Sequence, residues 1–313
     1  MAAFVIRRIL ATIPVLGMVA VIVFLILRLT PGDPATLLAG DNATLAQIEE
    51  IRRHLGLDRS IVVQFVSWIG HLLRGDFGES FFFKMPVAAL IADRIQPTLS
   101  LALMTLIFTI VIAVPMGVIA ANRRGTWVDH AVMTFSVGGF SIPVFVLGYL
   151  LIYVFAIRLN WFPVQGFKSF DAGIRPFLSH LLLPSLTLSV VYIALVARIA
   201  RASVIEVLNE DYIRTAYSKG LTNRVVLTQH ALRNAAIPIV TVIGMGVALL
   251  IGGAVVIESV YNIPGLGRLT VDAVLSRDYP TIQAMVLLFS FIYVMINMLV
   301  DLSYAVLDPR IRY

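Results

Sequence analysis

A polar insert at residues 198–238 lies between two strongly apolar stretches and carries six Lys and Arg side chains. Its most distinctive run is Arg214-Thr215-Ala216-Tyr217-Ser218-Lys219-Gly220-Leu221. Such a loop is too polar to lie in lipid, and its pattern is too regular for a simple connector. Its charged and hydroxyl groups suit recognition of a soluble partner, and the small Thr215 and Ala216 would let another protein's backbone come close. The sequence therefore predicts a docking element.

Residues that could carry out covalent or metal chemistry are scarce. The chain has no cysteine, which excludes disulfides and thiolate chemistry. The histidines show no metal-ligand spacing: His54, His71, His130, His180 and His230. There is no Gly-x4-Gly-Lys-Ser/Thr run to hold a nucleotide. We predict no catalytic residue, no bound cofactor and no metal in this chain.

The composition is that of a membrane protein. Only 13% of the 313 residues are charged and 59% are hydrophobic, whereas soluble domains carry about 25% charged residues. Six segments are long and apolar enough to cross a membrane as helices. They are residues 9–29, 98–121, 131–157, 177–197, 237–257 and 282–302. Prolines within them predict kinks or local unwinding: Pro14, Pro115, Pro143 and Pro184.

Charge predicts the orientation of these spans. An even number of spans places both termini on one side, together with the 198–238 insert. The whole net charge of +6 falls on that side, and the positive-inside rule makes it cytoplasmic. The expected parts are a cytoplasmic tail and first span (1–29), an external subdomain (30–96), a core transmembrane domain (97–305) and a cytoplasmic tail (306–313).

The external segment has helical patterns of its own. Residues 31–34 read as a turn that ends the first span. Thr44 and Gln47 have capping-box spacing before a short helix that Gly56 ends. A second apolar stripe runs through residues 61–73, and residues 86–95 predict a short helix that leads into the second span. The sequence thus predicts a small external helical subdomain.

Within the insert we expect two helices. Residues 206–219 favour a helix with acids at its start, Asp211 among them, and Lys219 at its end. Gly220 is suited to the left-handed conformation that ends a helix. Thr222 or Asn223 can then begin a second helix. A plainer alternative is an amphipathic hairpin lying on the inner leaflet.

The run at residues 214–221, together with several others, resembles a known family, the permease subunits of bacterial ATP-binding-cassette importers. Arg214-Thr215-Ala216-x-x-x-Gly220-Leu221 is similar to their Glu-Ala-Ala–x3–Gly loop, with Arg in place of Glu as in the peptide branch. Further runs resemble dipeptide, oligopeptide, glutathione and nickel permeases. They lie at residues 31–34, 55–58, 75–80, 211–216, 230–234 and 308–313.

The resemblance implies an all-α, six-helix type I importer permease of the bacterial inner membrane, multi-pass, with both termini cytoplasmic. It implies a second homologous permease subunit, two ATPase subunits that hold ATP and magnesium, and an external substrate-binding protein. Membrane lipid is the remaining partner, and no nucleic acid is expected. The coupling residues would be Asp211, Arg214, Thr215, Ala216, Lys219, Gly220 and Leu221. ATP-driven closure of the ATPases would move this loop and open the path outward.

Other polar and small residues admit structural interpretations. Asp301, one turn after Asn297, would pair with Arg198 or Arg201 rather than touch substrate. Glu258, at the outer end of its span, would meet water or Arg268 at the rim. The stripe at residues 244, 248 and 252 favours packing against the partner permease over lining the path. Residues 138–143 could unwind the third span.

Two other functional classes fit less well. A secondary transporter would carry ionisable residues at the midplane of its spans, and these spans are nearly free of charge there. A membrane-embedded enzyme would need a nucleophile, metal ligands or an acid pair within the spans. The substrate stays open among dipeptides, oligopeptides and glutathione, with nickel as an alternative.

Overall fold

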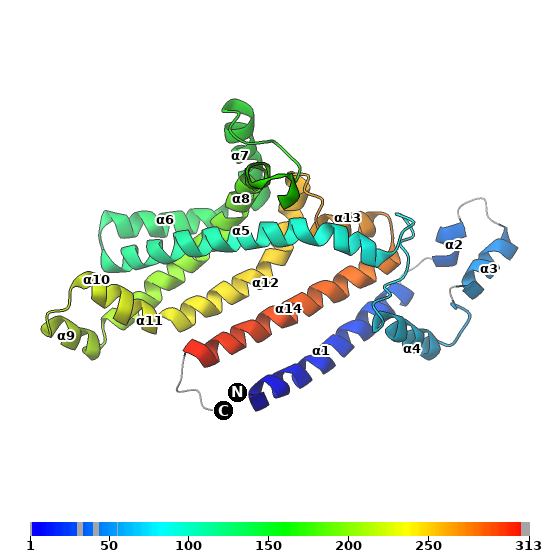
Figure 1. Cartoon of the computed structure of the whole chain (residues 1–313), viewed down its shortest axis with the longest axis horizontal. Helices are drawn as coiled ribbons and strands as arrows, with labels where there is room; N and C mark the ends of the chain where they lie inside the picture. The colour runs from blue at the N-terminus through cyan, green and yellow to red at the C-terminus, as the bar shows by residue number, and fades with distance from the viewer. Residues whose placement is uncertain (1, 30–33, 40–43, 55, 308–313) are drawn as a thin grey trace. The chain divides into compact units, whose positions relative to one another are not determined.

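A computed structural model describes residues 2–29, 34–39, 44–54 and 56–307, and these are almost entirely helical (Figure 1). Within them the only strand-like pairing is an isolated antiparallel bridge between Glu79 and Pro86. The chain divides into two compact units. The first unit is Met1–Ile95 with Leu269–Val294, and the second unit is Gln96–Arg268 with Met295–Tyr313.

Four helices in the described parts are long and apolar enough to cross a membrane. They are α5 (Val87–Asn122), α8 (Ile174–Leu208), α12 (Ala236–Val260) and α14 (Tyr279–Leu307). A bent pair of helices, Trp127–Ser141 with Val144–Arg158, makes up to five. The first predicted span falls in α1 (Ala2–Leu29), where the described apolar stretch is Leu10–Leu25. The all-α membrane fold is confirmed. The predicted number of six spans is not fully confirmed, because four or five spans are found in the described residues.

The first unit holds the short helices that follow α1. They are α2 (Pro34–Ala39), α3 (Leu45–His54) and α4 (Ile61–Leu72). The predicted capping box is present before α3, because Thr44 N–H donates to Gln47 Oε1 at 2.9 Å. Gly56 has a φ of +64°, as its place after α3 requires. Residues 31–33 of the predicted turn and the closing run at 308–313 lie outside the described residues, and Pro34 begins α2.

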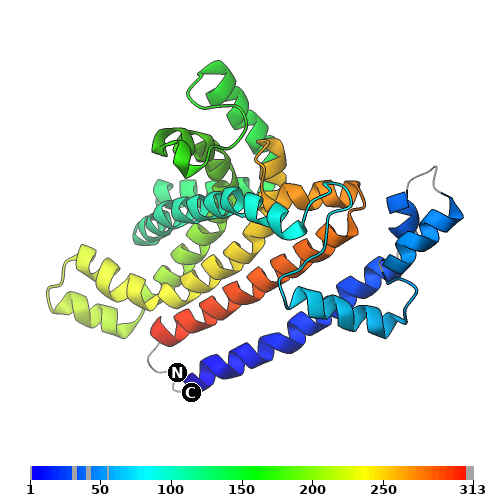
Figure 2. The same cartoon turned by 45° about the vertical axis from the view of Figure 1, so that its right-hand side comes forward.

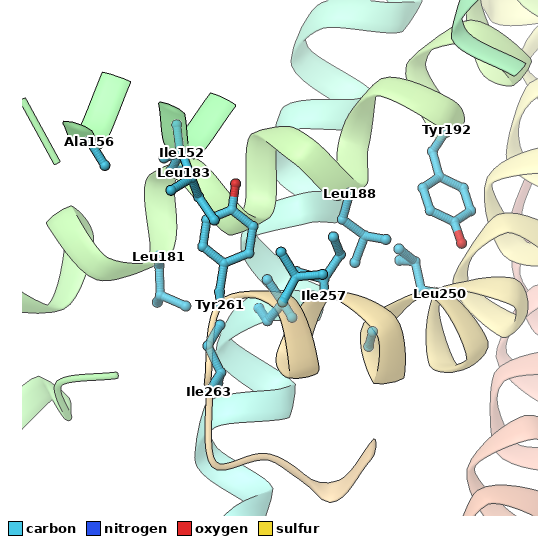
Figure 3. Packing of buried hydrophobic residues seen from close by; sticks show 13 residues of the cluster. Ile152, Ala156, Leu181, Leu183, Leu188, Tyr192, Leu250, Ile257, Tyr261 and Ile263 are labelled. Atoms are coloured by element: carbon cyan, nitrogen blue, oxygen red, sulfur yellow. The ribbon is translucent and has the colours of Figure 1, made fainter. Parts of the chain in front are cut away.

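The second unit packs around α8, which contacts α6 (Trp127–Ser141), α7 (Val144–Leu151) and α12. Figure 3 shows part of its apolar core, in which Leu181 and Leu188 of α8 lie near Ile257 of α12 and Tyr261. Tyr261 is buried, and its hydroxyl lies 2.7 Å from that of Thr187. Such paired hydroxyls satisfy polar groups that would be costly alone in an apolar core.

The third predicted span is not one helix. α6 ends at Ser141, α7 begins at Val144, and their axes differ by 103°. Pro143 explains the break, because it lacks an N–H and disfavours helical geometry in the residue before it. Ile142 is accordingly extended, with φ −93° and ψ 122°. α5 and α8 instead continue as helices through Pro115 and Pro184. α7 passes into a π-helix, η1 (Ile152–Arg158).

Short elements complete the two units. η2 (Phe170–Ala172) is a 3₁₀ turn before α8, and α13 (Leu266–Leu275) follows α12. The insert contains α9 (Asp211–Ser218), α10 (Asn223–Val225), the π-helix η3 (Val226–Ala231) and α11 (Leu232–Asn234).

Candidate functional site

The insert forms a helical hairpin at one end of the second unit, where α9 lies beside the 223–234 segment (Figure 2). Sequence favours one helix over residues 206–219, but the structure breaks it. Glu206 and Leu208 belong to the end of α8, and α9 starts at Asp211 after a turn at Asn209 and Glu210. Glu210 has an extended ψ of 146°, which redirects the chain before α9. α9 is therefore a separate short helix, free of the axis of α8.

One side of α9 packs onto the insert itself. Ile213 and Ala216 are 1% and 5% exposed and form a cluster with Val226 of η3. Leu208 and Leu221 pack against that cluster. Ala216 was predicted to leave room for another protein's backbone, but it faces this cluster instead. Its small side chain lets α9 lie close to η3.

The other side of α9 is exposed. Tyr212, Thr215 and Lys219 follow one another at helical spacing and are all exposed. Some desolvation, together with the nearby Glu210 carboxylate, raises the pKa of Tyr212 above its usual value. Arg214 contacts Asp211 at 3.2 Å, with side chains 76% and 94% exposed. A pair this exposed contributes about 0–1 kcal/mol, so either group can pair with a partner instead.

Gly220 ends this helix in the conformation predicted for it. Its φ is +79°, a left-handed geometry that glycine adopts without strain. The amides of Gly220 and Leu221 donate to Tyr217 and Ala216 carbonyls at 2.9 and 3.3 Å. Leu221 is half-buried beside the cluster under α9. The turn thus fixes the angle between α9 and the segment that follows.

A chain of hydrogen bonds that was not predicted anchors the hairpin to α5. Tyr217 Oη donates to Asn223 Oδ1 at 2.7 Å, and Asn223 Nδ2 donates to Asn122 Oδ1 at 3.0 Å. Asn122 is the last residue of α5. Only the polar character of these residues hinted at a role, because they are separated by 101 positions in the chain.

A second anchor lies between α6 and α8. Arg201 donates from Nη2 to Asp129 Oδ2 at 2.7 Å and also pairs through Nε. Asp129 is 3% exposed and accepts the N–H of Gly125 as well. Arg201 therefore has Asp129, and not the predicted Asp301, as its ion-pair partner. Arg198, the other predicted partner of Asp301, places its guanidinium over the Phe140 ring.

Asn297 and Asp301 lie one turn apart on α14, as predicted. Asn297 is exposed and Asp301 is half-buried.

Glu258 differs from the rim residue that the sequence predicts, because its side chain is fully buried. Its Oε1 accepts from the Thr98 hydroxyl at 2.6 Å, and its Oε2 accepts the backbone N–H of Arg268 at 2.9 Å. Thr98 Oγ1 accepts the N–H of Leu266 at 2.8 Å. A Cβ at Gly265 would collide with the carboxylate. The carboxylate thus caps the start of α13, where a negative charge is favourable.

Gly244 and Gly252 of the predicted stripe, and Gly253 beside it, have different surroundings in α12. A side chain at Gly244 would collide with Val300 of α14, and one at Gly253 would meet Leu188 of α8 at 2.9 Å. Gly252 has no neighbour within 4 Å of where a Cβ would lie. Close packing inside this chain therefore explains Gly244 and Gly253, whereas Gly252 remains open to a neighbour.

Known proteins resemble this chain over nearly its whole length. Residues 113–313 match the family model described as binding-protein-dependent transport system inner membrane component. Residues 1–102 match the model for the N-terminal part of such membrane components. A probable peptide ABC transporter permease, y4tP of Sinorhizobium fredii, is 52% identical over the full length of both chains. The glutathione transport system permease GsiC of Escherichia coli K12 is 46% identical, again over both full chains.

The solved structures add a match in fold. A chain of the MetNI methionine ABC transporter, in a structure titled as inward facing, superposes with a TM-score of 0.57. It is 18% identical and covers 70% of this chain and 96% of its own.

Proposed function

This chain belongs to the family of binding-protein-dependent transport system inner membrane components, and on that premise we propose that it imports short peptides or glutathione. It is a multi-pass inner-membrane permease subunit of an ABC importer and not itself an enzyme. The peptide and glutathione permeases similar to it over their full length support this choice of cargo.

The 198–238 insert is the element that receives movement from an ATPase subunit. The observation that carries this proposal is the two-sided character of α9. Ile213 and Ala216 fix the helix from behind, and Tyr212, Thr215 and Lys219 face outward. A helix that is held firmly on one side and polar on the other can be pushed by a partner without unfolding. Asp211, Arg214, Gly220 and Leu221 complete the coupling set.

The importer contains partners beyond this chain. ATPase and substrate-binding partners accompany permeases of this family, and we infer a second similar permease with two ATPase subunits. ATP and magnesium are then bound on the ATPases. Both termini and the insert lie on the cytoplasmic side, because the excess positive charge gathers there. Basic groups on that side also contact anionic lipid.

The segment 30–96 is an external subdomain that contacts the substrate-binding protein. Its helices α2, α3 and α4 are too short to span a membrane. Deleting residues 34–72 should abolish docking of the binding protein while leaving the ATPases attached. Retained docking would contradict this role.

Co-purification and uptake test the coupling role. Replacing Tyr212 and Arg214 together by Ala removes two exposed groups without touching the buried cluster. We expect loss of the ATPase subunits from the tagged complex, loss of peptide uptake, and normal amounts of permease in the membrane. Arg124→Ala is the matched control, because Arg124 is exposed in the turn between α5 and α6 and not on α9. Unchanged uptake and retention in the double variant would refute the coupling role.

A further inference from the structure

A pocket of about 380 Å³ lies inside the first unit, apart from the coupling element. It is formed by the end of α4, the 76–84 turn and the first residues of α14. Its volume lies within the range of about 300–1,000 Å³ that small-molecule sites have. The functions proposed so far for the membrane spans and for the 198–238 insert do not involve this pocket.

One wall of the pocket contains an unsatisfied polar group. Gln283 lines the pocket and is 8% exposed, and its amide nitrogen has no hydrogen-bond partner in the described structure. A buried amide N–H without an acceptor is costly, and native proteins keep few of them. The nitrogen itself has less than 1 Å² of accessible surface. A turn of the Gln283 amide toward the pocket would let it donate to a carbonyl or carboxylate oxygen of a ligand.

Charges of both signs line the same pocket. Asp76 and Glu79 supply carboxylates, and Lys84 supplies an ammonium group. Asp76 Oδ1 accepts the N–H of Gly78 at 2.9 Å, which holds this carboxylate in the turn. A ligand that carries both an ammonium group and a carboxylate matches this combination, whereas a plain anion or cation matches only half of it.

The walls are held in place before any ligand arrives. Trp68 packs against Phe24 and Phe65, with ring centroids 5.6 and 6.1 Å away. Asp278, which is fully buried, accepts from the hydroxyl of the lining residue Ser80 at 2.5 Å and from the Phe81 N–H at 2.9 Å. These contacts fix the turn against the start of α14. A rigid site loses less entropy when a ligand binds.

We propose that this pocket binds a short peptide in its zwitterionic form. Asp76 and Glu79 would receive the amino terminus, Lys84 and the Gln283 amide the carboxylate, and Trp68 an apolar side chain. The proposal rests on the proposed function as a peptide permease, and it adds a substrate site in the permease itself, on the segment predicted to be external.

Calorimetric titration of the whole importer complex in lipid nanodiscs, without the external binding protein, tests the pocket. The probes are alanylphenylalanine and its N-acetylated, C-amidated form, which lacks both charges. We expect the free dipeptide to bind at least about tenfold more tightly than the blocked form. Gln283→Leu, Glu79→Gln and Lys84→Gln should each weaken the dipeptide by about fivefold or more. Lys168→Gln is the control, because Lys168 is an exposed lysine of the second unit.

Gln283→Leu gives a readout that a merely structural glutamine would not. It removes a buried group without a partner, so the Tm of the complex should stay the same or rise while dipeptide affinity falls. Absence of dipeptide binding, equal binding of the blocked form, or unchanged affinity in all three variants would overturn the pocket. Peptide uptake with the binding protein present separates the two proposals. Uptake with no pocket effect refutes only the pocket, and no uptake of any peptide refutes the cargo class.

Discussion

Replacing Gly220 tests whether backbone strain or side-chain size limits which residue can occupy the turn that ends α9. Gly220 has a φ of +79°, and a Cβ built there meets no atom within 4 Å. Inside this chain the cost of a side chain is therefore backbone strain and not a clash. For an ordinary L-residue the left-handed conformation costs about 1–2 kcal/mol, and Asn tolerates it better. We expect Gly220→Ala to disturb the turn more than Gly220→Asn, although Asn is larger.

The strain translates into a measurable loss of docking. If the strained turn is the geometry that an ATPase subunit binds, 1–2 kcal/mol corresponds to about a 5- to 30-fold weaker affinity for Gly220→Ala. Gly220→Asn should stay within about threefold of the wild type, since Asn visits this region routinely. Titration of ATPase subunits onto the permease pair in nanodiscs measures both values. Equal amounts of folded permease provide the control.

The opposite ranking would refute this reasoning. If Asn weakens docking more than Ala, a partner surface fills the space beside Gly220 and side-chain size decides the outcome. If both variants bind as the wild type does, the turn does not contribute to the docking geometry.

Three further replacements test the packing that holds the spans, each by the Tm of the purified complex. Gly117→Val should cost about 1–3 kcal/mol, because a Cβ there already lies 2.6 Å from that of Ala200; an unchanged Tm would contradict this close approach. Asp129→Asn should cost about 1–3 kcal/mol by weakening the charge-assisted bonds to the part-exposed Arg201, whereas Asp129→Leu with Arg201→Met should recover most of the loss. No recovery would show that the charges themselves are needed. Glu258→Gln should cost about 1–3 kcal/mol, because one amide hydrogen would face a donor, and Glu258→Ala should cost more. A stable Glu258→Ala variant would argue against a capping role.

Hydropathy predicted the long helices because lipid leaves the backbone no alternative partner for its hydrogen bonds. A local pattern also predicted the role of Gly220, since a glycine after a run of helix-forming residues commonly ends a helix. The Thr44–Gln47 capping box is another local pattern that the structure contains. These features depend on neighbours within a few positions, which a single sequence displays.

Features that depend on distant residues were not predictable. Asn209 is a weak helix former, but one such residue among the helix formers of 206–219 does not by itself mark the end of α8. Arg201 has its partner 72 positions away, and Glu258 and Thr98 are 160 positions apart. The sequence shows that Ala216 is small, but only tertiary packing determines that it faces the cluster with Ile213 and Val226. Pro143 was recognised as a point of weakness, while the 103° bend depends on how α7 packs on α8 and α12.

Within the second unit, helix α5 is hydrogen-bonded to other elements near both of its ends. Asn122 is tied to Asn223 in the insert, and Thr98 is tied to the Glu258 carboxylate. The roughly 24 residues between them rise by about 36 Å, more than the thickness of the hydrocarbon core of about 30 Å. Because the Thr98–Glu258 bond is 2.6 Å long, a displacement of about 1 Å along the line of the bond would carry it beyond hydrogen-bonding range. A displacement of α5 at Asn122 would therefore be carried along one continuous helix to the Thr98–Glu258 bond.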